Sequence, residues 1–144
     1  MVGDVRISDQ DRPGRDELVE LYGSVGWGAY THDPDRLVRA LEGSMRVVTA
    51  RRDGQLVGLA RVVGDGVSIA YLQDILVHPD LHRSGLGRAL ISAVFEPLSD
   101  VRQKVLMTDA EPGQRAFYEA VGFTEVHDVE DGGLRAFVRF DPPA

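Results

Sequence analysis

Apolar residues recur along this chain with two spacings, which predict helices and strands. Residues three or four apart, such as Leu18, Leu21 and Tyr22, are typical of amphipathic helices. Short apolar runs bounded by Gly, Pro or Asp are typical of strands. The predicted helices cover residues 13–22, 34–42, 85–98 and 113–121. The predicted strands cover residues 5–7, 45–52, 55–63, 67–77, 104–107, 123–129 and 134–140.

The turns between these elements follow from a few polar and glycine-containing segments. Asp53-Gly54 is a hairpin signal between two predicted strands, and residues 131–133 give the same signal for a final hairpin. Residues 23–30, which contain Trp27 and Tyr30, are broken by glycines and predict a loop. Strand 67–77 is apolar on both faces and is expected at the centre of the sheet.

The element order β-α-α-β-β-β-α-β-α-β-β favours an α/β or α+β fold, with helices on both faces of a mixed central sheet. No repeat, linker or low-complexity segment divides the chain. We therefore expect residues 1–144 to form one domain with one core.

Composition narrows the function classes. The chain carries a formal net charge of −7, which argues against nucleic acid as a partner and is compatible with a cationic substrate. It has no cysteine, so disulfides, zinc–thiolate sites and a cysteine nucleophile are excluded. The first residues lack the apolar core of a signal peptide, and no run approaches a membrane span. A cytoplasmic protein without a membrane partner is expected.

The segment that carries most chemistry is a strand followed by a glycine loop and a helix. The strand ends at Val77, and the loop runs through His82, Arg83 and Ser84 to Gly85 and Gly87. A helix that begins here presents unpaired N–H groups and the positive end of its dipole, which suits a phosphate. The third glycine of a dinucleotide fingerprint and the Gly-Lys-Ser/Thr of a P-loop are both missing. A tight turn before a core helix is the alternative interpretation.

The residues around the glycines resemble the acetyl-CoA-binding motif of the GCN5-related N-acetyltransferase (GNAT) family, V-x-P-x-x-[QR]-x-x-G-x-G-x-x-L. Val77, Pro79, Gly85, Gly87 and Leu90 lie at the matching spacings. Residues 117–123, Phe-Tyr-Glu-Ala-Val-Gly-Phe, are similar to a second family motif, and residues 54–61 to its third strand. The chain departs from the pattern where His82 replaces Gln or Arg.

The resemblance implies an acetyl-CoA co-substrate and a set of site residues. Backbone N–H groups at Ile75 to Val77 would polarise the thioester, and Tyr118 would protonate the leaving thiolate. The alternative for Tyr118 is a core tyrosine. The residues expected to bind the co-substrate are Ile75, Leu76, Val77, His82, Arg83, Ser84, Gly85, Leu86, Gly87 and Arg88.

The acceptor side is less defined. Asp74 is a candidate general base, but it equally suits orienting a substrate by charge or bracing the strand. Gln73 cannot be a base. Strand alternation directs it to the face opposite Asp74 unless a bulge intervenes, and it is a candidate acceptor-binding residue. Trp27 and Tyr30 suit an amine-binding pocket or the core. The histidines lack metal-ligand spacing, and no metal is expected.

These observations predict direct transfer of an acetyl group from acetyl-CoA to a primary amine of a small molecule or peptide. A ternary complex is expected because the chain has no cysteine to carry the acetyl group. A CoA-binding sensor without catalysis and transfer of a longer acyl group are the alternatives. The edges of the predicted final hairpin would suit a homodimer.

Overall fold

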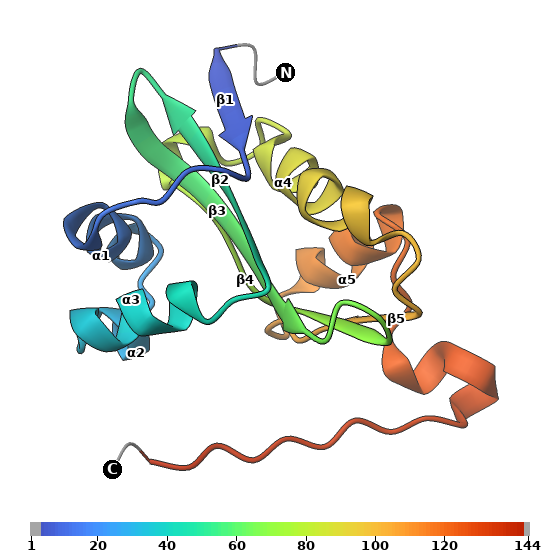
Figure 1. Cartoon of the computed structure of the whole chain (residues 1–144). Coiled ribbons are helices and arrows are strands. Elements are labelled where there is room, and N and C mark those ends of the chain that lie inside the picture. The colour runs from blue at the N-terminus through green and yellow to red at the C-terminus, as the bar shows by residue number, and fades with distance from the viewer. Residues whose placement is uncertain (1–3, 143–144) are drawn as a thin grey trace. The chain divides into compact units, whose positions relative to one another are not determined.

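The computed structural model describes residues 4–142, which divide into two compact units, one ending at Met107 and the other beginning at Thr108 (Figure 1). The first unit contains a five-stranded sheet in the order β1-β2-β3-β4-β5. Neighbouring strands are antiparallel except β4 and β5, which are parallel. The strands are β1 (Val5–Ser8), β2 (Arg46–Arg52), β3 (Gln55–Gly64), β4 (Ile69–Val77) and β5 (Gln103–Leu106).

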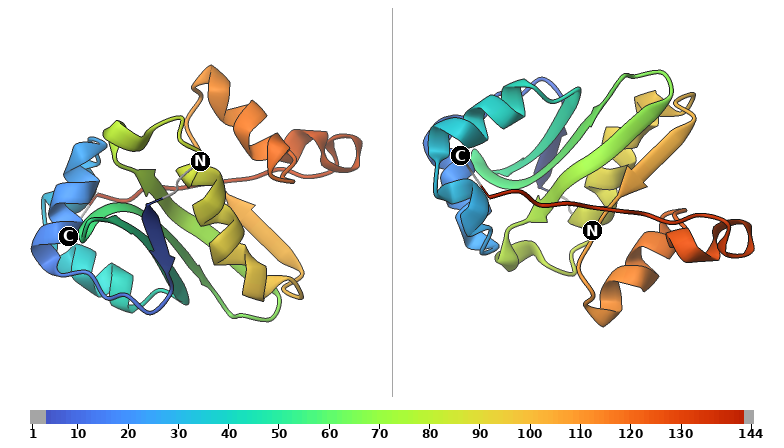
Figure 2. Two further views of the ribbon diagram at one scale, coloured as in Figure 1. Left: turned by 90° about the horizontal axis from the view of Figure 1, so that it is seen from above. Right: turned by 90° about the horizontal axis from the view of Figure 1, so that it is seen from below.

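Helices cover both faces of this sheet, as predicted (Figures 1 and 2). One face carries α1 (Arg15–Ser24), α2 (Gly28–Thr31) and α3 (Pro34–Glu42), and the other carries α4 (Leu86–Phe95) with the short 3₁₀ turn η2 (Glu96–Leu98). Asp33 caps α3 by accepting a hydrogen bond from the Arg36 N–H at 3.2 Å. The predicted loop at residues 23–30 is partly wrong, because α2 places Tyr30 on a helical turn.

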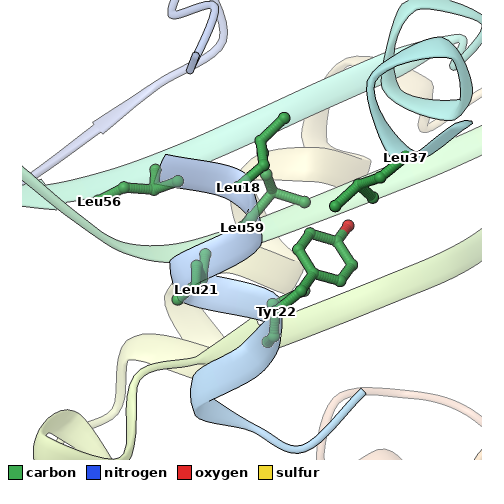
Figure 3. Close-up of a cluster of buried hydrophobic side chains, with 7 residues drawn as sticks. Leu18, Leu21, Tyr22, Leu37, Leu56 and Leu59 are labelled. Atoms are coloured by element: carbon green, nitrogen blue, oxygen red, sulfur yellow. The ribbon is translucent and has the colours of Figure 1, made fainter. Parts of the chain in front are cut away.

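The core beneath α1 and α3 consists of buried side chains from four elements of the first unit. In Figure 3, Leu18, Leu21 and Tyr22 of α1 lie over β3 beside Leu37 of α3. Tyr22 is fully buried, so its hydroxyl group must find a partner inside the protein. On the other face, Gly58 lets α4 approach closely, because a Cβ there would lie 3.0 Å from Leu90 Cδ1.

The pairing of β3 with β4 contains a bulge that determines which way the site residues face. Arg61 pairs with Asp74 and Val62 pairs with Leu72, so Gln73 is the extra residue. The register shift moves the residues after it to the other face of the strand. Asp74 therefore reaches the α1 and α2 side, in line with Leu76 of the core cluster.

The second unit contains α5 (Pro112–Ala120) and the irregular 3₁₀ segment η3 (Val126–Gly132). Gly122 follows α5 with φ of 100°, as expected for a glycine that ends a helix. The predicted strand at residues 123–129 is wrong. Arg115 of α5 forms ion pairs with Glu125 at 2.9 Å and Asp128 at 2.6 Å, which fold this segment beside α5.

The predicted strand at residues 134–140 is also absent, so the element order lacks its last two strands. An alternating sequence becomes a strand only where a sheet edge pairs with it, and no segment of the second unit does so among residues 108–142. This segment is extended and exposes Leu134, Phe137, Val138 and Phe140. The hairpin edges that suggested a homodimer are therefore not present in this structure.

None of the helices in the described part of the chain is long and apolar enough to cross a membrane.

Candidate active site

The glycine loop joins β4 to α4 through the 3₁₀ turn η1 (Pro79–Leu81) and two left-handed residues. Arg83 has φ of 63° and Gly85, the residue that caps α4, has φ of 89°. Leu81 and Leu86 are buried on either side and anchor the loop to the core of the first unit. This backbone path explains why a glycine stands at position 85, since other residues adopt that conformation at a cost.

The start of α4 offers free hydrogen-bond donors. The Ser84 hydroxyl accepts a bond from the Leu86 N–H at 3.3 Å, but the N–H groups of Gly87 and Arg88 have no acceptor within residues 4–142. The exposed side chains of Arg83 and Arg88 form no ion pair with any residue that the structure describes. Donors, helix dipole and two cations thus meet at one end of one helix, which suits an anionic ligand.

His82 fastens this loop to β4. Its Nε2 lies 2.9 Å from the Val77 carbonyl oxygen, and because a carbonyl only accepts, Nε2 must donate. The neutral ring then has only Nδ1 left, which accepts. The structure thus gives the predicted pyrophosphate donor His82 another partner in the described chain.

The end of β4 has one edge open. On one side it pairs with β3 as far as Val77, and the His78 N–H bonds to the Val57 carbonyl at 2.8 Å. On the other side β5 pairs only with Ile69 to Leu72. Because N–H groups alternate along a strand, those of Ile75 and Val77 face the open side and that of Leu76 faces β3. The contact from His82 to the Val77 carbonyl supports this alternation.

Asp74 lies in a buried network at the bulge. Its side chain is 2% exposed and its Oδ2 accepts bonds from Arg61 Nε at 2.5 Å and from the Tyr22 hydroxyl at 2.8 Å. Its Oδ1 accepts a bond from the Tyr30 hydroxyl at 2.7 Å. Burial opposes the charge of Arg61, but the Asp74 carboxylate outweighs that effect and raises the pKa of the guanidinium. Both carboxylate oxygens of Asp74 are therefore engaged inside the protein, one of them by the charged guanidinium of Arg61.

Gln73 and Tyr30 connect this network to the surface. Gln73 is exposed, and its Nε2 lies 3.3 Å from the Tyr30 hydroxyl oxygen. The predicted opposite facing of Gln73 and Asp74 is therefore altered by the bulge, since both side chains reach the same phenol. Burial and then Asp74 raise the pKa of Tyr30, so the phenol is protonated at neutral pH.

Trp27 lies in an aromatic group with these tyrosines. Its ring centroid is 5.8 Å from that of Tyr22 and 6.1 Å from that of Tyr30, and it is half-buried against the core cluster. Sequence analysis identified Trp27, Tyr30, Gln73 and Asp74 separately, and the structure brings them together. It did not single out Arg61, and it interpreted Tyr22 only as part of the apolar face of a helix. An arginine in a run as apolar as residues 56–63 was the available signal.

Tyr118 belongs to the second unit, where it lies on α5. Its ring packs edge-on against Phe117 and Phe123, at centroid distances of 5.1 and 6.2 Å. Burial raises the pKa of its hydroxyl group, so the group remains a proton donor at neutral pH. Tyr118 is only partly buried, which is compatible with both a catalytic and a packing role.

Two further features of the described chain lie outside these groups of residues. Glu125, His127 and Asp128 lie close enough to share a cation, but they are exposed and Arg115 already pairs with both carboxylates. A hollow of about 610 Å³ lies at the C-terminal end of α4, beside Ala93 and Glu96, at the opposite end of this helix from the glycine loop. The lining of this hollow includes none of the residues of the glycine loop or of the Asp74 network.

Comparisons with known proteins show the family to which the chain belongs. The acetyltransferase (GNAT) domain family matches residues 16–138. An uncharacterized ycf52-like N-acetyltransferase of Prochlorococcus marinus is 36% identical over 113 residues, which are 75% of this chain and 61% of the relative. Serotonin N-acetyltransferase 2 of Oryza sativa is 34% identical over 110 residues, covering 74% of this chain and 54% of that protein. The matched part of the chain thus spans 61% of the length of the first relative and 54% of the length of the second.

A solved structure matches nearly the whole chain. A GNAT-family acetyltransferase from Streptococcus pneumoniae superposes with a TM-score of 0.79 and 28% identity, covering 95% of this chain and 99% of that one. The five-stranded mixed sheet with helices on both faces is therefore the fold of this family.

Proposed function

The chain belongs to the GNAT family of N-acetyltransferases, and we propose that it transfers the acetyl group of acetyl-CoA directly to a primary amine. The observation that carries this proposal is the glycine loop at the start of α4. Its free N–H groups lie beside the open edge of β4, and its two arginines have no ion-pair partner among residues 4–142. No other part of the described first unit combines a phosphate seat with free strand donors.

The loop would bind the pyrophosphate of CoA. The Gly87 and Arg88 N–H groups would donate to phosphate oxygens, and Arg83 and Arg88 would add charge from the rim. Ser84, Gly85 and Leu86 would contribute backbone shape. His82 would act through its bond to Val77, which ties the phosphate seat to the strand that faces the thioester.

The open edge of β4 would polarise the thioester. The N–H groups of Ile75 and Val77 face away from β3, so either could donate to the carbonyl oxygen as negative charge develops on it. Leu76 would contribute by its buried side chain, which holds this end of the strand in the core. The donors are part of a strand and need no rearrangement during the reaction.

The transfer would proceed in one ternary complex. The amine nitrogen lone pair forms the C–N bond, the C–S bond breaks, and its electrons pass to sulfur. Tyr118 gives its proton to the thiolate, the nitrogen releases its surplus proton to solvent, and Tyr118 regains a proton from solvent. A covalent acetyl-cysteine cannot form, because the chain contains no cysteine.

The proposed acceptor is a primary amine of a small molecule or peptide, bound near Trp27, Tyr30 and Gln73. The name of the rice relative, a serotonin N-acetyltransferase, supports small arylalkylamines as the first group to test. Aromatic rings suit such amines by stacking and by cation–π attraction. Asp74 stays a predicted acceptor-site residue.

We also propose that the two units form one GNAT domain, because the family match runs through both. The cytoplasmic location stays a prediction. For the homodimer the structure offers a new basis. The segment 134–140 exposes four large apolar side chains in the second unit, and within the first unit β5 is the edge strand of the sheet. In a homodimer, the apolar segment 134–140 of one copy could pack against the edge strand β5 of the other.

The experiment that tests the proposed function measures thiol release from acetyl-CoA with a panel of primary amines. We expect turnover with at least one amine and intersecting lines in double-reciprocal plots, as a ternary complex requires. Parallel lines, or a stable acetyl-enzyme seen by mass spectrometry, would contradict direct transfer. Tight CoA binding without turnover on any amine would support a sensor instead.

A further inference from the structure

The buried ion pair between Arg61 and Asp74 is connected to the exposed Gln73 side chain through the hydroxyl group of Tyr30. Both side chains are nearly inaccessible, at 7% and 2% exposure. Asp74 Oδ1 accepts a bond from Tyr30, and the oxygen of Tyr30 faces the exposed amide of Gln73. Tyr30 is thus the link between the core and the proposed acceptor region.

The directions of these hydrogen bonds follow from the groups involved. An ionised carboxylate only accepts, so Tyr30 must donate its single proton to Asp74. The Tyr30 oxygen is then left as an acceptor, and the Arg61 guanidinium at 3.4 Å and the Gln73 amide at 3.3 Å both approach it with N–H groups. Both distances are long, so an incoming donor can displace the Gln73 contact.

The same geometry argues against Asp74 as the base that removes a proton from the amine. One of its oxygens bonds Arg61 and Tyr22 and the other bonds Tyr30. A proton transferred to Asp74 would weaken the bonds by which Arg61, Tyr22 and Tyr30 stabilise its carboxylate in a buried site.

We propose that Asp74 is a positioning residue, and that Tyr30 and Gln73 are the residues that touch the acceptor amine. Asp74 holds the Tyr30 proton so that the phenol oxygen accepts an N–H from the amine, and the Gln73 amide oxygen accepts a second. This proposal rests on the proposed function, because it assigns roles within that reaction.

The arrangement selects for nitrogen donors with at least two N–H bonds. Two acceptors satisfy two N–H bonds of a neutral primary amine and leave its lone pair free for attack. A secondary amine offers one N–H and an alcohol offers one O–H, so each would leave one acceptor unpaired. Because the ion pair is closed, the site presents oriented dipoles and no net charge to the substrate.

The test compares four single variants with the wild-type enzyme, using the best amine from the panel. Tyr30→Phe removes the acceptor oxygen, Gln73→Leu removes the amide, and Asp74→Asn removes the charge that holds the Tyr30 proton. Asp9→Asn is the matched control, because it breaks the Arg46–Asp9 ion pair, which is 2.8 Å long and lies away from the network in the same unit. KM for each substrate, kcat, melting temperature and the pH profile are measured.

We expect Tyr30→Phe and Asp74→Asn each to raise KM for the amine about tenfold, while KM for acetyl-CoA changes less than twofold. That factor corresponds to the loss of one hydrogen bond. The double variant Tyr30→Phe/Asp74→Asn should be no worse than the poorer single variant, because both changes remove the same contact. Gln73→Leu should raise KM for the amine less, and Asp9→Asn should leave it unchanged.

Three results would overturn the proposal. One is an unchanged KM for the amine in folded Tyr30→Phe. Another is full additivity in the double variant. A third is loss of the acidic limb of the kcat/KM profile in Asp74→Asn, which would make Asp74 the base. If Asp74→Asn does not fold, Tyr30→Phe and Gln73→Leu still decide the matter. Failure of the proposed function is distinct, since it would appear as absent wild-type turnover.

Discussion

Tyr118 has two properties that substitution can separate. Its ring packs between Phe117 and Phe123, and its hydroxyl group retains a proton because burial raises its pKa. A raised pKa extends the acid form to higher pH than the ordinary value of about 10. Activity that needs the protonated phenol should therefore persist across neutral pH and decline only at alkaline pH.

We predict that Tyr118→Phe lowers kcat by about 10²–10⁴-fold and leaves KM for acetyl-CoA nearly unchanged, because the ring still packs. The alkaline limb of the kcat profile should disappear. The cost in stability should not exceed about 1 kcal/mol. Tyr71→Phe is the matched control, since burial raises the pKa of that tyrosine too and it lies outside both motifs. A kcat near the wild-type value in Tyr118→Phe would remove Tyr118 from the catalytic residues.

Single residues also show what the sequence can reveal about the site. Tyr118 and Gly85 could be predicted as site residues because they lie in contiguous motifs. The partner of Asp74 was not found, because Arg61 is thirteen residues away and becomes its neighbour only through antiparallel pairing. A one-residue bulge then determines which face of the sheet Asp74 occupies. The position of this bulge could not be predicted from a short sequence pattern.

At the scale of elements, the loop before α4 has the most demanding backbone. Gly85 has φ of 89°, and a Cβ added there would meet no atom within 4 Å. A substitution at Gly85 would therefore strain the backbone without causing a steric clash. The cost in stability depends on how well the new residue tolerates a positive φ. A β-branched side chain tolerates this conformation poorly, whereas asparagine tolerates it well.

We predict that Gly85→Val weakens CoA binding at least tenfold and that Gly85→Asn weakens it less, as measured by calorimetry. Gly54→Val is the matched control, because Gly54 has φ of 80° and open space in the β2–β3 turn. It should lose a similar stability, of about 1–2 kcal/mol, and keep its affinity for CoA. Equal CoA affinities for folded Gly85→Val and the wild type would contradict the assignment of the loop.

Elements predicted from local pattern were confirmed wherever a partner lay next to them in the sheet. The five strands of the first unit and the four longest helices were all predicted. The final hairpin was not formed, because residues 123–129 are held by Arg115 and residues 134–140 pair with nothing in their own unit. The alternation of apolar and polar residues shows which side chains of a strand would face the core. Whether the strand forms also depends on hydrogen bonds to a neighbouring strand, which is often distant in the sequence.

At the scale of the whole molecule, the exposed segment 134–140 leaves an unusual amount of apolar surface uncovered. Phe137 is 89% exposed and Phe140 is 81% exposed. Phenylalanines bury about 150–250 Å² each, so covering two in each of two copies removes roughly 600–1,000 Å² from water. With the opposing surfaces included, this reaches the range of stable interfaces.

We predict a homodimer that weakens on dilution, measured by light scattering after size-exclusion chromatography. The variant Phe137→Ser/Phe140→Ser should be monomeric at concentrations where the wild type is dimeric. Val67→Ser is the control, because Val67 is a lone apolar side chain with 75% exposure in the β3–β4 turn. A wild type that stays monomeric at every concentration would contradict the dimer, as would a dimer that survives the double substitution.

The bulge at Gln73 has a consequence for the evolution and redesign of this chain. The pairs on its two sides, Val62 with Leu72 and Arg61 with Asp74, would join in unbroken register if residue 73 were removed. A one-residue deletion inside a central strand usually shifts its register and moves its side chains to the wrong face. Deleting residue 73 would instead restore regular pairing between β3 and β4. A single-codon deletion in this chain would thus remove the Gln73 side chain while both halves of the strand keep their partners on β3.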